Sequence, residues 1–305
     1  MTTGRHGARI RAHAKINLSL HVHGLRPDGY HELETVFQSL ALHDTVTCTL
    51  TRGPFRVTCD DPAVPTDSRN LVWRAAERLW RALDRRGEMR GVDIALAKSI
   101  PSQAGLGGGS SDAAAALEAL AALWSADASV DLASIAAQVG ADAPYFLMGG
   151  TALGLSRGEK LYPLPELPAT HVVLALQAFG VPTADAYRWF DESRRAPGRS
   201  KQAGTDGETG GLVLAAGPLN RHSGMSNWNL VVHNDLEAPV VRRHPEIGAV
   251  RDVLARSGAF AASMTGSGSA VFGLFETSAA ARRAAQRVAE AGFVSMVTKT
   301  AGRRG

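Results

Sequence analysis

Hydrophobic and polar residues alternate without a break near the start of the chain. The apolar positions are Ile10, Ala12, Ala14, Ile16, Leu18, Leu20 and Val22. Polar residues, among them Lys15 and Asn17, occupy the positions between them. A period of two residues is typical of a strand with one buried face. It predicts a half-buried β-strand whose exposed face presents Lys15 and Asn17, ~7 Å apart along the strand.

The rest of the chain mixes strand and helix patterns. Further strands are predicted at residues 32–40, 44–50, 55–59, 92–97, 171–176, 262–275 (two strands around a glycine turn) and 293–298. We expect residues 44–50 and 55–59 to pair as a hairpin around Arg52-Gly53-Pro54. Helices are predicted at residues 70–83, 113–124, 132–139, 245–257 and 278–291.

A glycine-dense segment at residues 101–112 stands out from this pattern. Glycine occupies positions 105, 107, 108 and 109, and an Ala-rich helix follows at once. Glycines allow close backbone approach to a ligand, and the start of a helix offers unpaired N–H groups with a partial positive charge. The segment therefore predicts a site for a chain of phosphates. The alternative is a plain glycine turn in which Ser111 or Asp112 caps the helix.

This loop matches neither of the two common phosphate-binding motifs. No Lys follows the glycines, as a Walker A sequence requires. Ser110 stands where the dinucleotide-binding fingerprint has its third glycine. We therefore expect a third kind of phosphate loop.

Length and composition narrow the class of protein. A chain of 305 residues with 45% hydrophobic and 20% charged residues is long enough for two globular domains. No run of ~18 apolar residues predicts a membrane span, and the N-terminal region lacks the apolar stretch of a signal peptide. Cys48 and Cys59 match neither a disulfide framework nor a metal motif, which fits a reducing cytoplasm.

Charge and loop composition leave the type of ligand open. The net charge of +4 permits a nucleic acid partner but suits a phosphate-rich small substrate equally well. Residues 193–211 are polar and Gly-rich, and their Arg and Lys residues predict a solvated loop rather than an RNA-binding patch. Three prolines within residues 163–170 predict a domain boundary.

Several motifs together resemble those of a known family. The loop at 101–112 and a second glycine turn at 264–272 resemble the two glycine motifs of the GHMP kinases. Four shorter motifs are similar to those of members that phosphorylate a cytidine diphosphate-linked polyol. They are Ala14-Lys15-Ile16-Asn17-Leu18, Asp28-Gly29-Tyr30-His31, Gly140-Ala141-Asp142-Ala143-Pro144 and Asn234-Asp235-Leu236-Glu237.

The resemblance implies an α+β protein with the two-domain GHMP kinase fold. Residues 1–162 would form the N-terminal ATP-binding α/β domain, which in this family contains a left-handed βαβ unit. Residues 163–305 would form a ferredoxin-like C-terminal domain, whose last strand is expected to return toward the N-terminal domain. The active site would lie in the cleft between them.

The resemblance also implies a reaction and the residues that perform it. The enzyme would transfer the γ-phosphoryl group of ATP to the 2-hydroxyl group of the polyol, with Mg²⁺ bridging the phosphates, in the non-mevalonate route to isoprenoid precursors. Asp142 would be the catalytic base, with Lys15 beside it. By sequence alone, Asp142 is also a good helix cap before Ala143-Pro144.

The implied binding residues form two groups. Those for ATP are Pro101, Ser102, Gln103, Ala104, Gly105, Leu106, Gly107, Gly108, Gly109, Ser110, Ser111, Asn70, Leu71 and Lys98. Those for the cytidine substrate are Asn17, Tyr30, His31, Thr183 and Tyr187. Asn70 reads equally well as a helix cap, Tyr30 and His31 as residues flanking a turn, and Tyr187 as a core residue. A Mg²⁺ ligand is not identified, although Ser110 or Ser111 offers an oxygen.

Two other functions are compatible with parts of this pattern. One is a GHMP kinase acting on homoserine or mevalonate, against which the aromatic residues Tyr30 and Tyr187 argue because small acids need no aromatic clamp. The other is a nucleotide- or RNA-binding protein without catalysis, against which the presence of both Lys15 and Asp142 argues. We therefore expect a small-molecule substrate, no nucleic acid or membrane partner, and a monomer or homodimer.

Overall fold

The computed structural model describes residues 2–4, 7–195 and 232–303, so most of the predicted loop at 193–211 lies outside the described residues. Its larger sheet has eight strands within this part of the chain, with the main order β1-β2-β3-β5-β4. The main strands are β1 (Thr2–Gly4), β2 (Gly7–Leu25), β3 (His31–Pro54), β5 (Arg90–Ala97) and β4 (Arg56–Cys59). The sheet is extended by β6 (Thr151–Ser156), β7 (Lys160–Pro163) and β9 (His233–Asn234).

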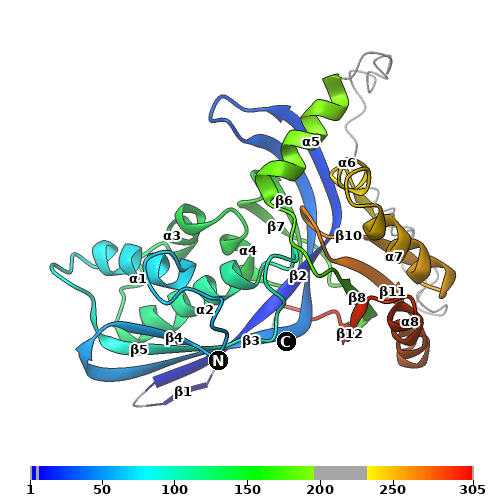
Figure 1. Cartoon of the computed structure of the whole chain (residues 1–305). Helices are drawn as coiled ribbons and strands as arrows, with labels where there is room; N and C mark the ends of the chain where they lie inside the picture. Colours follow the sequence, from blue (N-terminus) through cyan, green and yellow to red (C-terminus); the bar gives the residue numbers. More distant parts are fainter. Residues whose placement is uncertain (1, 5–6, 196–231, 304–305) are drawn as a thin grey trace.

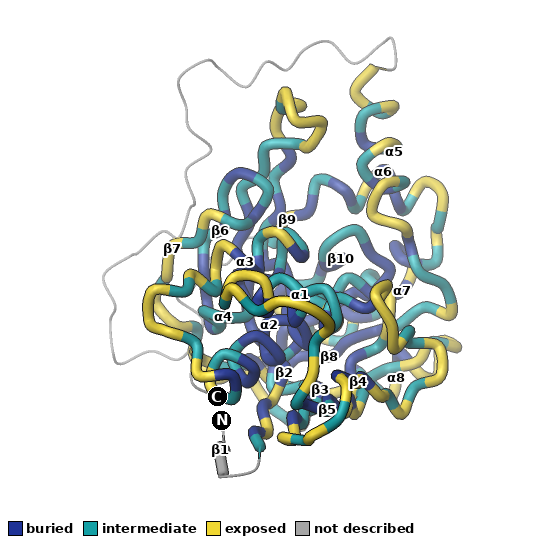
Figure 2. Tube along the Cα trace, turned by 90° about the vertical axis from the view of Figure 1, so that its left-hand side faces the viewer, coloured by how far each residue is buried: buried dark blue, intermediate teal, exposed yellow. Residues whose placement is uncertain are grey.

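Four helices pack together over the larger sheet (Figure 1). They are α1 (Leu71–Ala82), α2 (Gly108–Leu123), α3 (Leu132–Val139) and α4 (Ala143–Met148). The Ala-rich helix α2 is the central one, and Figure 2 shows most of its trace as buried. Alanine side chains allow α2 to contact both α1 and strand β2 closely, which fixes the start of the helix relative to the sheet.

The smaller sheet is antiparallel and has the order β10-β11-β8-β12. Its strands are β8 (His171–Leu176), β10 (Ala261–Met264), β11 (Val271–Phe275) and β12 (Val294–Lys299). The accompanying helices are α5 (Thr183–Arg195), α6 (Glu237–Val241), α7 (Pro245–Arg256) and α8 (Ser278–Glu290). Helices α7 and α8 lie beside this sheet in Figure 1, and their apolar sides join one core cluster with its strands.

The two sheets are joined through a shared core. Ile16 and Leu18 of β2 belong to the same buried cluster as Leu174 of β8 and Phe272 of β11. After β12 the chain returns to the larger sheet, where the Ala301 N–H donates to the Ser39 carbonyl at 2.8 Å. Strand β12 itself, however, pairs with β8 in the smaller sheet. The chain passes from the larger sheet to the smaller one between β7 and β8. The division into domains 1–162 and 163–305 stays a prediction, and β9 does not follow it, because this strand lies in the second range but pairs with β2 in the larger sheet.

The predicted hairpin at residues 44–59 is wrong. Strand β3 continues to Pro54, but β4 does not pair with it. Strand β5 lies between the two, antiparallel to β3 and parallel to β4. Helix α1 therefore connects the parallel strands β4 and β5 as a βαβ unit. The sequence Arg52-Gly53-Pro54 has the local pattern of a hairpin turn. However, the edge of β3 that a hairpin would pair with β4 is hydrogen-bonded to β5, which comes later in the chain.

The predicted start of the central helix is also wrong. Helix α2 begins at Gly108, and Gly107 is its N-cap with φ of +73°. Ser111 and Asp112 are buried inside the first turns rather than capping the helix. Only glycine adopts this left-handed conformation at low cost, so Gly107 turns the loop into the helix earlier than the serines predict.

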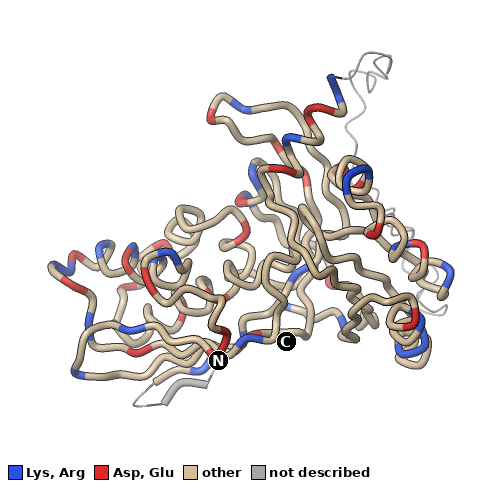
Figure 3. Tube along the Cα trace, in the orientation of Figure 1, with Lys and Arg blue, Asp and Glu red and all other residues tan. Residues whose placement is uncertain are grey.

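Charged residues of both signs are interspersed along the described trace (Figure 3). None of the helices in the described part of the chain combines the length and apolar character that a membrane-spanning segment needs. Both cysteines are free thiols in strands, Cys48 in β3 and Cys59 in β4.

Candidate active site

A cavity of about 720 Å³ lies where segments of the two sheets meet. Its walls come from β2, β3, the loop before α2, the start of α5 and the glycine turn between β10 and β11. Most of the residues predicted for ATP or substrate line this cavity; Ser111, Tyr30 and His31 do not. A cavity of this size is large enough for nucleotide-sized ligands.

The two glycine turns meet at one wall of the cavity. A Cβ atom on Gly105 would lie 2.4 Å from the carbonyl oxygen of Thr265, so the two backbones touch at a point where only glycine fits. The Ala270 N–H donates to the Ala104 carbonyl at 3.2 Å. The side-chain amide of Asn234 donates to the Met264 and Gly266 carbonyls at 2.8 and 2.9 Å. The second turn therefore supports the first.

The start of α2 faces the same cavity. Gly107, Gly108 and Gly109 all line it. The first N–H groups of a helix have no partner within the helix and carry a partial positive charge. A Cβ atom on Gly107 would lie 2.6 Å from the Phe146 ring and 3.1 Å from Cγ of Lys15, so glycine brings the helix start against Lys15. The cavity thus offers unpaired amides beside an ammonium group.

Lys15 and Asp142 meet at this point. The Lys15 Nζ lies 3.4 Å from a carboxylate oxygen of Asp142. Lys15 is only 3% exposed, so its predicted place on an exposed strand face is wrong. Both faces of β2 are covered here, because the second glycine turn lies over the face that the pattern assigns to solvent. The side chain of Asp142 is 33% exposed and open to the cavity.

Asp142 occupies the N-cap position of α4, but its side chain makes no capping hydrogen bond. Asp131, by contrast, caps α3 by accepting from the Ser134 N–H at 3.1 Å. The carboxylate of Asp142 is therefore free of the structural task that its sequence position predicts. Its ion-pair partner in the structure is Lys15.

Asn17 holds Lys15 in place. The Lys15 ammonium donates to the Asn17 side-chain oxygen at 2.6 Å. The amide nitrogen of Asn17 donates to Thr35 Oγ1 at 2.7 Å, and its backbone N–H donates to Thr265 Oγ1 at 3.0 Å. These bonds engage both ends of the Asn17 amide, so its main contacts are within the protein. Direct contact of Asn17 with substrate stays a prediction.

The residues predicted for the cytosine base lie near one another but not all in the cavity. The rings of His31 and Tyr187 are stacked, with centroids 5.1 Å apart. His31 Nε2 lies 3.0 Å from a carboxylate oxygen of Asp191. Tyr30 is 55% exposed and packs beside the Arg157 guanidinium, 5.0 Å from the ring centroid. Burial raises the pKa of the Tyr187 phenol, which keeps it protonated.

Thr183, the remaining residue predicted for the substrate, lines the cavity at the start of α5. Its hydroxyl oxygen lies 3.2 Å from the hydroxyl oxygen of Ser267. The contact joins the wall formed by α5 to the second glycine turn.

The structure gives Asn70 the role of a helix cap. Its side chain accepts from the Val72 N–H at 2.8 Å and donates to the Pro65 carbonyl at 2.6 Å. Asn70 and Leu71 still line the cavity. Contact of Asn70 and Leu71 with adenine therefore stays a prediction, which concerns only those atoms of the two residues that line the cavity.

Lys98 is held between two buried carboxylates. Its ammonium group bonds to Asp44 and, at 2.6 Å, to Asp112. Asp44 also accepts from the Ile100 N–H at 2.8 Å. Burial raises the pKa of Asp112 to about 7. The cluster anchors the strand end, the phosphate loop and α2 together, which gives Lys98 a structural task beside its predicted place near ATP.

Ser111 is turned away from the loop. It is 2% exposed and lines a different cavity, of about 730 Å³, together with residues of β2 and α4. The helix begins earlier than predicted, which rotates Ser111 to the rear of its first turn. Ser110 is the serine that lines the main cavity.

Several residues of the cavity are absent from the predicted site. Arg157, in the turn between β6 and β7, lines the cavity. Thr35, Ser267 and Arg69 also line it. Ser267 could have been predicted, because it lies in the second glycine turn. The sequence around Arg69, Arg157 and Thr35 contains no motif that would predict their place in the cavity.

Comparison with known proteins shows the family to which this chain belongs. The model of the GHMP kinases N-terminal domain matches residues 70–150, and that of the GHMP kinases C-terminal domain matches residues 215–293. A homoserine kinase from Cytophaga hutchinsonii shares the fold, with a TM-score of 0.69 and 20% identity over 99% of this chain and 96% of that one. The fold and the two glycine turns define a GHMP kinase.

Closer relatives identify the branch. A 4-diphosphocytidyl-2-C-methyl-D-erythritol kinase from Gloeobacter violaceus is 42% identical over 96% of this chain and 94% of its own length. One from Moorella thermoacetica is 42% identical over 95% and 98%. A crystal structure of 4-(cytidine 5'-diphospho)-2C-methyl-D-erythritol kinase matches with a TM-score of 0.75 and 35% identity, covering 97% of this chain and 100% of that one. The chain belongs to the 4-diphosphocytidyl-2-C-methyl-D-erythritol kinase family, which confirms the predicted family and fold class.

Proposed function

We propose that this protein transfers the γ-phosphoryl group of ATP to the 2-hydroxyl group of 4-diphosphocytidyl-2-C-methyl-D-erythritol, a step in the non-mevalonate route to isoprenoid precursors. The observation that supports it most directly is the Lys15–Asp142 pair, 3.4 Å apart, at the edge of a glycine-lined cavity. Phosphoryl transfer depends mainly on positioning and charge stabilisation, with a nearby group to take the proton of the hydroxyl. The phosphate loop, Lys15 and Asp142 are our candidates for these three tasks.

The phosphate loop and the start of α2 supply the positioning. Gly108 and Gly109 line the cavity at the start of α2, where the free N–H groups of a helix suit the phosphate oxygens of ATP. The contact between Gly105 and the Thr265 carbonyl holds the loop in shape before a ligand arrives. Donors that need no rearrangement stabilise a transition state more than mobile ones, and loss of one costs ~3 kcal/mol.

Asp142 is the proposed base. Its carboxylate makes no capping bond, so it is available to accept the proton of the acceptor hydroxyl. The Lys15 ammonium lies 3.4 Å from the Asp142 carboxylate, close enough for the two groups to form an ion pair. This ammonium also faces the region where the acceptor oxygen and the transferred group would lie. Asn17 fixes the direction of that ammonium.

The far wall suits a nucleoside. Tyr187 lines the cavity and offers an aromatic surface to a base, while His31, which does not line the cavity, stacks against the Tyr187 ring and supports it. The exposed ring of Tyr30 would have to move toward this wall to contact the cytosine, since it lies beside Arg157. An aromatic wall of this kind favours the cytidine substrate over homoserine or mevalonate.

The residues at the loop fit a Mg²⁺ ion bound with ATP. One carboxylate oxygen of Asp112 is buried without a hydrogen-bond partner, and Asp112 lines the cavity next to Ser110. Mg²⁺ prefers such oxygen ligands together with phosphate and water. Ser110 and Asp112 would hold the ion, which neutralises charge on the β- and γ-phosphates when bound.

The substitution Asp142→Asn tests the proposal. We expect kcat to fall at least ~100-fold in a coupled ATP-consumption assay with the cytidine substrate, because the amide takes no proton. The thermal midpoint should stay near that of the wild type, because no capping bond is lost.

The matched control is Asp131→Ala, which removes a real cap. It should lower stability by ~1 kcal/mol and leave kcat unchanged. Full activity of Asp142→Asn would refute the assignment of the base. Phosphorylation of homoserine or mevalonate, without turnover of the cytidine substrate, would refute the proposed acceptor.

A further inference from the structure

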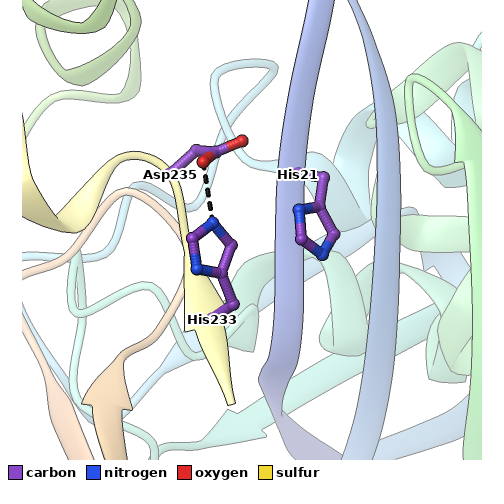
Figure 4. Close-up of side chains that lie close together, drawn as sticks. All are labelled: His21, His233 and Asp235. Atoms are coloured by element: carbon purple, nitrogen blue, oxygen red, sulfur yellow. Dashed lines mark hydrogen bonds and ion pairs between the residues drawn. The ribbon is translucent and has the colours of Figure 1, made fainter. Parts of the chain in front are cut away.

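A second cluster of ligand-type side chains lies outside the catalytic cavity. His21 of β2, His233 of β9 and Asp235 just after β9 each present one ligand atom, and these atoms lie within 4.8 Å of one another (Figure 4). None of the three lines the catalytic cavity. Leu20 does line it, and neighbouring side chains of a strand point to opposite faces, so His21 faces away from the kinase site.

The backbone under this cluster is held in place. Strand β9 pairs with β2 in parallel, with His233 opposite Ser19 and Asn234 opposite Leu20. The Asp235 N–H donates to the Leu20 carbonyl at 3.0 Å. The cluster therefore joins two segments, at His21 and His233, that lie more than 200 residues apart in the sequence.

The side chains are oriented as well. One carboxylate oxygen of Asp235 accepts from the Val22 N–H at 2.7 Å, and the other lies 2.7 Å from His233 Nε2. The rings of His21 and His233 are stacked, with centroids 4.7 Å apart and planes 17° from parallel. A histidine–aspartate pair alone does not require a second imidazole against it.

We propose that His21, His233 and Asp235 bind a divalent transition-metal ion of the zinc type. Two imidazoles and a carboxylate match the donors that Zn²⁺ and Co²⁺ select, whereas Mg²⁺ prefers oxygen ligands alone. Zinc–ligand distances of ~2.0–2.2 Å set tetrahedral ligand atoms roughly 3.4 Å apart, so on binding the 2.7 Å contact between His233 and Asp235 has to open, and separations of up to 4.8 Å within the cluster have to shorten. Three protein ligands leave one position to water, and His233 is exposed enough to admit it.

A bound ion would fasten β9 to β2. Between the two β9-side ligands stands Asn234, whose amide holds the Met264 and Gly266 carbonyls of the second glycine turn. The ion would thus stabilise the attachment of that turn from the opposite side of the strand. This role is independent of the reaction that the cavity performs.

Metal titration of the untagged full-length protein tests the inference. After treatment with a chelator, Zn²⁺ is added and binding is followed by calorimetry; Co²⁺ is added in parallel and followed by its visible absorption. We expect one strong site, an absorption spectrum typical of tetrahedral Co²⁺, and a higher thermal midpoint with Zn²⁺ present. A large excess of Mg²⁺ should not displace the ion.

The variants His21→Gln and His233→Gln should each bind Zn²⁺ at least ~10-fold more weakly and lose the thermal shift. His23→Gln is the matched control, because His23 is exposed on the same strand and outside the cluster. It should bind as the wild type does. The His21 side chain makes no hydrogen bond within the described part of the chain, so His21→Gln tests the site without breaking the hydrogen bonds of Asp235.

Three results would overturn the inference. The first is a wild type that shows no Zn²⁺ binding or thermal shift. The second is binding that His21→Gln and His233→Gln leave intact. The third is a loss in His23→Gln as large as that in His21→Gln, which would indicate nonspecific binding to surface histidines.

Discussion

Replacing Gly105 by Ala tests whether the two glycine turns must touch. Gly105 has φ of +76°, a left-handed conformation that side chains disfavour. The added Cβ would lie 2.4 Å from the Thr265 carbonyl oxygen and 3.2 Å from that of Gly268. Both are backbone atoms, so neither can rotate out of the way as a flexible side chain would. The loop or the second turn has to shift.

The size of the effect follows from these contacts. The left-handed conformation costs Ala ~1–2 kcal/mol, and the overpacking adds ~1–3 kcal/mol. The free energy of unfolding should therefore fall by about 2–5 kcal/mol, which lowers the thermal midpoint by roughly 4 °C or more. Ordinary contact begins near 3.4 Å, so the turns must separate by about 1 Å. A shift of that size at a reacting centre costs ~100-fold in rate.

Gly109→Ala is the matched comparison for stability. Its Cβ would meet only Cδ1 of Leu71, at 3.6 Å, and the residue is helical. Ala in a helix is ~1 kcal/mol more favourable than Gly, so this variant should be as stable as the wild type or more so. Urea denaturation and ATP kinetics measure the two effects. If Gly105→Ala were as stable as Gly109→Ala, with unchanged kcat/KM for ATP, the reasoning would fail.

Two further predictions concern buried ionisable groups. Lys98→Met leaves Asp44 and Asp112 buried without their cation, and urea denaturation near pH 8.5 should show a loss of ~3–5 kcal/mol. Burial raises the pKa of Asp112 to about 7, above its unfolded value, so protonation of Asp112 favours the folded state as pH falls. The loss of stability in Lys98→Met should therefore be smaller near pH 6 than near pH 8.5, and an equal loss at the two pH values would contradict this reasoning. Burial also raises the pKa of the Cys48 thiol to about 12, so iodoacetamide should modify the partly exposed Cys59 first, as followed by mass spectrometry; equal rates would contradict the burial of Cys48.

Local patterns predicted most elements of this fold. The strand at 171–176 and the helix at 132–139 have the predicted bounds, and Asp131 caps that helix as expected. These features depend on the preferences of neighbouring residues, on the period of burial and on capping groups a few positions away. The glycine density at 105–109 likewise indicated a loop shaped for close backbone approach, and the structure places it at the cavity.

Pairing between distant segments was less predictable. The turn at residues 52–54 predicted a hairpin, but β5 lies between β3 and β4. An edge of a strand accepts whichever partner the whole chain brings to it, and a turn alone does not decide which one. The same reason explains β9, two residues that cross to the larger sheet from the C-terminal part of the chain.

The amino-acid sequence by itself determined where the chain turns, coils and extends, because these choices depend on backbone freedom and side-chain periodicity over short distances. Only the tertiary structure decided which polar groups became buried and paired. Lys15 appears exposed from the strand period, yet Asn17 beside it bonds to Thr265, 248 positions away, and the chain covering that face leaves the Lys15 ammonium next to Asp142. Electrostatic attraction and desolvation act through space, so the chemistry of the site arises only when those remote segments come together.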